Sequence, residues 1–77
     1  MPRLPRVSAR QLIGALEKQD FVLLRSKGSH RIYYHLRTEK RITIPYHGTR
    51  IIPPGTLASI LREAGIDREE LRELLKR

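Results

Sequence analysis

The sequence contains no cysteine and no tryptophan, and it has a single phenylalanine among 77 residues. Without cysteine, neither a disulfide framework nor a thiolate zinc site can form. No stretch approaches the roughly 20 apolar residues of a membrane-spanning helix. The three histidines lack metal-ligand spacing and a neighbouring carboxylate cluster, so we expect neither a metal ion nor another cofactor. These absences favour a small cytoplasmic protein without a membrane partner.

Acidic residues are also scarce, because eight Asp and Glu stand against sixteen Lys and Arg, which gives a net charge of +8. The excess is uneven: residues 25–50 hold seven basic residues and one acidic residue, Glu39. A local excess of positive charge is expected where a polyanion such as RNA binds. The alternative is a generally basic surface with no such partner.

Apolar periodicity predicts three helices and three strands in one domain over residues 1–77. Ser8 and Gln11 form a capping-box pattern before the first helix, and Asp67 and Glu70 repeat it before the last. Residues 1–6 are expected to form a flexible basic N-terminus. The expected elements are a helix over 9–19, strands over 21–25, 30–36 and 41–44, a helix from residue 55 or 56 to Gly65, and a final helix after Asp67.

This order predicts an α+β fold, in which a three-stranded antiparallel sheet carries all the helices on one face. The apolar strand over 21–25 is expected to be buried on at least one face. In the second strand, alternation assigns Ile32, Tyr34 and Leu36 to the face beneath the helices. In the third, it assigns Ile42 and Ile44 to that face. The solvent-facing side is then expected to carry Arg31, Tyr33, His35, Arg41 and Thr43.

A hairpin turn with a histidine at its exit is the most distinctive stretch. Gly28 suits the positive φ of a tight turn, and His30 follows where the second strand begins, flanked by Lys27 and Arg31. An imidazole has an ordinary pKa of about 6.5, which suits removal of the proton from an RNA 2′-hydroxyl. The neighbouring cations can stabilise charge on the phosphate. The alternative is a histidine that only caps the strand.

The other candidate residues have structural alternatives too. His47 is a second acid–base candidate if its loop folds back towards His30, and otherwise packs in the loop or contacts RNA. Ser29 can bind a phosphate or stabilise the turn. Tyr33 can stack a base or stand exposed, and His35 is expected to be solvated or to face RNA.

Four short motifs follow one another along the chain. They are Lys27-Gly28-Ser29-His30, then Ile32-Tyr33, then Ile42-Thr43-Ile44-Pro45 with His47, and finally Pro54-Gly55-Thr56-Leu57 with Ile60-Leu61-Arg62 and Ala64-Gly65 after it. In this order and spacing they resemble the HicA toxins of prokaryotic toxin–antitoxin modules. The resemblance extends from about residue 8 to residue 75.

The resemblance implies a fold similar to that of double-stranded-RNA-binding domains. It also implies a ribonuclease that cuts messenger RNA, halts translation and is neutralised by a HicB antitoxin. The family's essential histidine lies in a glycine-x-histidine hairpin motif that corresponds to His30, and Gly28 and Ser29 match the residues that lead into it. The basic N-terminus before Val7 is less typical of the family.

The sequence therefore predicts a metal-independent endoribonuclease, with His30 as general base or acid and His47 as a candidate second group. The residues expected to contact RNA are Lys27, Gly28, Ser29, Arg31, Tyr33, His35 and Arg41. Two alternatives remain: a non-catalytic RNA-binding module of the same fold, and a small adaptor whose basic face binds an acidic protein.

Overall fold

The computed structural model describes residues 4–77. The elements are α1 (Ala9–Glu17), β1 (Phe21–Lys27), β2 (His30–His35), β3 (Arg41–Pro45), α2 (Pro54–Ala64) and α3 (Arg68–Lys76). This order confirms the predicted α+β fold. No helix in this part of the chain is long and apolar enough to span a membrane.

The N-terminal segment was expected to be flexible over residues 1–6. Its first three residues lie outside the described part of the chain. Leu4, the first residue described, packs partly buried against the hydrophobic core.

Helix α1 begins where the sequence predicts. The Ser8 side chain accepts a hydrogen bond from the backbone N–H of Gln11, and the Gln11 side chain accepts one from the N–H of Ser8. The helix ends at Glu17, two residues earlier than predicted, with Lys18 as its C-cap. The Lys18 ammonium then donates to the carbonyl of Leu74 at 2.8 Å, which joins the end of α1 to α3.

The remaining helices also follow their local signals. Pro54 occupies the first turn of α2, where its missing N–H costs no hydrogen bond. Gly65 ends α2 with φ +73°, and the N–H of Ile66 donates to the carbonyl of Leu61, which confirms the predicted Schellman stop. Asp67 and Glu70 form the predicted capping box of α3.

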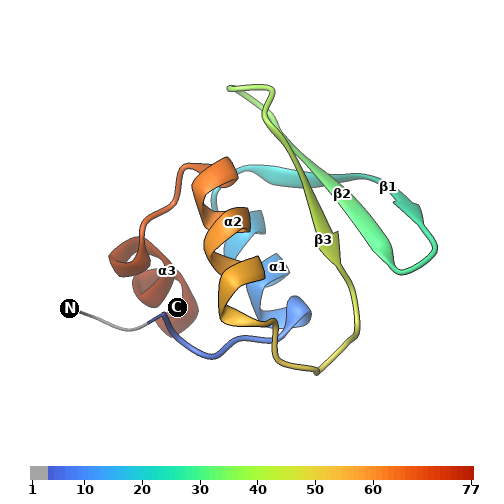
Figure 1. Ribbon diagram of the computed structural model, residues 1–77. Helices are drawn as coiled ribbons and strands as arrows, with labels where there is room; N and C mark the ends of the chain where they lie inside the picture. Colours follow the sequence, from blue (N-terminus) through green and yellow to red (C-terminus); the bar gives the residue numbers. More distant parts are fainter. Residues whose placement is uncertain (1–3) are drawn as a thin grey trace.

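The three strands form one antiparallel sheet in the order β1-β2-β3, so β2 is central. Figure 1 shows the helices on one side of the sheet, with the β1–β2 hairpin extending past them. Helix α1 packs against β1 and α2 packs against β3 on this inner face, and α3 packs against α1. The fully buried leucines are Leu12, Leu16, Leu57 and Leu71.

The face assignment predicted for β2 is wrong. Tyr33 pairs with Ile42, and His35 pairs with Phe21. Directly opposed residues of an antiparallel ladder share one face. Because Ile42 and Phe21 lie under the helices, Tyr33 and His35 are buried with them, at 2% and 8% exposure. Arg31 pairs with Ile44 and therefore also belongs to the inner face.

The residues predicted to face inward occupy the other positions. Ile32 and Tyr34 lie half-buried on the outer face, and Leu36 lies beyond the end of β2 and is exposed. Alternation alone favours the wrong face of β2, because the set with Ile32 and Leu36 is more apolar than the set with Arg31 and His35. The pairing with β3 decides between them.

Strand β1 is less buried than predicted. Only Phe21 is buried, while Val22, Leu23 and Leu24 are each 40–49% exposed. β1 is an edge strand, and its pairing with β2 is interrupted between Leu23 and Arg25. Leu24 is therefore the extra residue of a β-bulge.

Candidate nucleic-acid interface

The outer face of the sheet consists of three rows, each with one residue from each strand. The two ladders define these rows, because opposed residues share a face. They are Lys27–His30–Pro45, Arg25–Ile32–Thr43 and Val22–Tyr34–Arg41. We call these nine residues the outer face. It carries three cations and a histidine and no acidic residue.

The bulge at Leu24 brings two of those cations to the outer face. Without it, alternation from the buried Phe21 would turn Arg25 and Lys27 towards the helices. The extra residue shifts the phase, so Arg25 pairs with Ile32 and Lys27 pairs with His30. Bulges commonly re-aim side chains beside functional sites. Arg25 could not be predicted for this face, because no residue near Leu24 signals a bulge.

The hairpin turn is tighter than predicted, because the expected strands over 21–25 and 30–36 left four residues, 26–29, for the loop. Strand pairing continues to Lys27 and His30, which leaves only Gly28 and Ser29 as the loop. Gly28 has φ +58°, as a two-residue hairpin with glycine at its first central position requires. Such a short loop fixes the first residue of β2 against the last residue of β1, and thereby holds His30 beside Lys27.

His30 is exposed, and its neighbour on the other side is Pro45. The N–H of Tyr46 donates to the carbonyl of Ser29 at 2.6 Å. This bond joins the residues flanking the His30–Pro45 pair, so the pair itself occupies a non-hydrogen-bonded site. Proline, which has no N–H, is tolerated there. At such sites the Cα atoms are only about 4.5 Å apart, so the two side chains lie close together.

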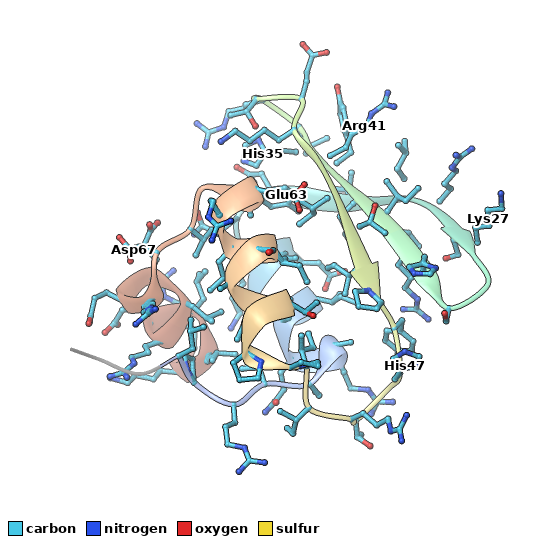
Figure 2. All side chains as sticks on the ribbon, viewed as in Figure 1. Lys27, His35, Arg41, His47, Glu63 and Asp67 are labelled. Carbon is cyan, nitrogen blue, oxygen red and sulfur yellow. The ribbon has the colours of Figure 1, made fainter. Side chains whose placement is uncertain are left out.

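The loop after β3 carries His47, which is exposed (Figure 2). Two residues of chain from Pro45 to His47 span at most about 7 Å. Added to the His30–Pro45 spacing, this keeps the Cα atoms of the two histidines within about 12 Å. Gly48, the next residue, accepts a hydrogen bond from the N–H of Arg10 in α1. The loop thus holds both imidazoles at one end of the sheet.

Arg31 and Tyr33 occupy the inner face near the same end. The Arg31 guanidinium lies over the Tyr46 ring, with its central carbon 3.6 Å from the ring centroid. Burial raises the pKa of Tyr33 above its usual 10.0, and the Arg31 hydrogen bond and charge oppose that shift. This stacking orients Arg31 towards Tyr46 and stabilises the loop that carries His47.

His35 has a structural position far from the hairpin turn. Its Nδ1 accepts hydrogen bonds from the backbone N–H groups of Arg37 and Thr38, at 3.1 and 3.0 Å. Its ring meets Phe21 edge to face, with centroids 4.8 Å apart. The predicted outward position of His35 and Tyr33 is therefore wrong, and burial removes both rings from any base-stacking surface. Of the remaining candidates, Lys27 and Arg41 lie on the outer face, and Gly28 and Ser29 form its turn.

Within residues 4–77, no three His, Asp or Glu side chains gather in a group that could hold a metal ion. A search of curated proteins finds no match to the chain. A family model described as "HicA toxin of bacterial toxin-antitoxin" matches residues 9–66. The matched segment contains the whole sheet, helices α1 and α2, and the loop with His47.

Proposed function

This chain belongs to the HicA toxin family, with an antitoxin as its partner, and we propose that it is a metal-independent endoribonuclease that cuts messenger RNA. The observation that carries the proposal is the row Lys27–His30–Pro45. It presents an exposed imidazole at the end of a basic surface, with a cation beside it. Cleavage of messenger RNA would halt translation and take place in the cytoplasm.

RNA carries its own nucleophile, the 2′-hydroxyl next to each phosphate. In the proposed reaction, His30 removes the 2′-hydroxyl proton and the resulting oxygen attacks the adjacent phosphorus. The bond from phosphorus to the 5′-oxygen then breaks, and that oxygen takes up a proton. Lys27 stabilises the negative charge that develops on the phosphate oxygens. His47 is our candidate for the group that protonates the leaving oxygen, because the loop keeps it within reach of the same phosphodiester.

The RNA backbone would follow the outer face. Arg25 and Arg41 extend the positive charge away from His30 along the other two rows. Contacts of this kind bind phosphates without reading sequence. Gly28 and Ser29 would bring the backbone of the turn close to the RNA. We propose that a HicB-like antitoxin neutralises the toxin by covering this face.

The test is cleavage of RNA by the wild type, His30→Ala and His47→Ala in the presence of EDTA, with RNA binding measured in parallel. General acid–base catalysis typically contributes about 10²–10⁴-fold, so His30→Ala should lose cleavage by that factor and retain binding. His30 is exposed, so the variant should fold. If no protein cuts while all three bind, the domain is a non-catalytic RNA-binding module. Cleavage by His30→Ala at the wild-type rate would refute the assignment of His30.

A further inference from the structure

A pocket of about 350 Å³ opens beside the His30 row, at the end of β3. Its lining residues come from the end of β3 and from the loop that leads to α2. They are Pro45, His47, Arg50, Ile51, Ile52 and Pro53. Ligand pockets begin at about 300 Å³, so this one suits a ligand no larger than a single nucleoside.

Backbone hydrogen bonds hold the pocket in shape. At one end, the N–H of Tyr46 binds the hairpin turn. At the other, the N–H of Ile52 donates to the carbonyl of Val7 at 2.8 Å, and Ile51 bridges to Ser8. Between them, the N–H of Arg50 donates to the carbonyl of His47, which closes a turn. A binding site whose loop is already fixed loses little conformational entropy when a ligand binds.

The lining has two kinds of side chain. Prolines and isoleucines provide apolar walls against which a base can pack. His47 and Arg50 are exposed at the pocket and provide hydrogen-bond donors. An arginine fork binds phosphate oxygens or the acceptor edge of a base in two-point geometry. Apolar walls with a few donors match the chemistry of a nucleobase joined to a phosphate.

The position of Pro45 connects the pocket to the proposed reaction. Pro45 lines the pocket and is also the close neighbour of His30 across the sheet. His30 itself is not part of the lining. A base inside the pocket would therefore leave its ribose and 3′-phosphate at the rim, where the imidazole stands.

We propose that this pocket binds the nucleobase on the 5′ side of the scissile phosphate, and that Arg50 is a specificity-determining residue. This inference rests on the proposed ribonuclease function. Binding of the base there would orient the 2′-hydroxyl towards His30. It would also make cleavage depend on the base at that position, although the outer face binds only phosphates.

The first experiment is a titration of the isotope-labelled chain with each of the four nucleoside 3′-monophosphates, followed by amide chemical shifts. Ribose 5-phosphate and inorganic phosphate serve as probes without a base. We expect the nucleotides to shift the amides of His47, Arg50, Ile51 and Ile52, and the baseless probes to leave Ile51 and Ile52 unmoved. Equal shifts from inorganic phosphate, or nucleotide shifts confined to other residues, would overturn the proposal.

Variants then separate the pocket from catalysis. Arg50→Ala should weaken nucleotide binding by roughly tenfold and change the base preference of cleavage. Arg62→Ala, which removes the same charge from an exposed position on α2, should change neither nucleotide binding nor base preference. His30→Ala should lose cleavage, while nucleotides should still shift the amides of Ile51 and Ile52. If nucleotides shift these amides but the protein does not cut RNA, the ribonuclease function is refuted and the pocket stands as a nucleotide-binding site. Cleavage with unaltered base preference in Arg50→Ala would refute the pocket alone.

Discussion

Replacement of His35 tests whether that imidazole belongs to the core or to an RNA-facing surface. In His35→Ala, the backbone N–H groups of Arg37 and Thr38 lose their shared acceptor, Nδ1. Each unsatisfied buried donor costs about 1–3 kcal/mol, and the low end applies here because both bonds are only partly buried. Loss of the edge-to-face contact with Phe21 adds about 0.5–1.5 kcal/mol. The sum is about 3 kcal/mol.

Thermal unfolding followed by circular dichroism measures this loss. For a domain of this size, each kcal/mol lowers Tm by about 4–8 °C, so His35→Ala should unfold about 12–24 °C below the wild type. Two matched variants separate the contributions. His35→Asn retains an acceptor without the ring, and His35→Phe retains a ring without the acceptor. Each should recover part of the lost stability.

RNA binding by folded His35→Asn should equal that of the wild type, because His35 is not on the outer face. The reasoning fails if His35→Ala is destabilised by less than about 1 kcal/mol. It also fails if the Asn variant remains as stable as the wild type while its RNA affinity falls. That second result is the one expected of an exposed, RNA-facing histidine.

Three further changes test the turn, the core tyrosine and the outer face. Gly28→Ala should lower the free energy of unfolding in urea by about 1–2 kcal/mol, because φ is +58° and no atom crowds the position. Gly28→Asn should lower it by less, because asparagine tolerates a positive φ better than alanine does. Equal losses in the two variants would contradict a cause in the backbone conformation. Burial raises the pKa of Tyr33, so the folded state holds the phenol proton more tightly than the unfolded state does. The stability that this difference contributes is complete below about pH 10 and is lost as the pH rises through the raised pKa of folded Tyr33. The wild type should therefore lose more stability above about pH 10 than Tyr33→Phe does. Lys27→Ala should lower the slope of log affinity for RNA against log salt by about one, whereas Arg62→Ala should leave it unchanged.

The sequence predicted the elements whose signals are local. The caps at Ser8 and Asp67, the stop at Gly65 and the alternation of β3 all depend on residues a few positions apart. The same holds for the turn that presents His30. Each of these features has a short-range physical cause, so each could be predicted from the sequence without knowledge of the fold.

The features that were missed depend on pairing between distant residues. The phase of β2 is decided by the register of Tyr33 against Ile42. The burial of His35 depends on its pairing with Phe21, 14 positions earlier in the printed sequence. The pocket loop is likewise held by the hydrogen bond from Ile52 to Val7, 45 positions earlier in the printed sequence. No propensity or spacing encodes these contacts.

The bulge at Leu24 also restricts how the length of this chain can vary. Phe21 must point under the helices and Lys27 must point away from them, and six peptide steps separate the two. Removing Leu24 would restore simple alternation over five peptide steps, which leaves Phe21 and Lys27 on their present faces. Adding one residue while the bulge is kept would instead turn either Phe21 or Lys27 to the wrong face. Functional relatives should therefore tolerate loss of the bulge residue, and libraries should be depleted of single-residue insertions in this segment rather than of that deletion.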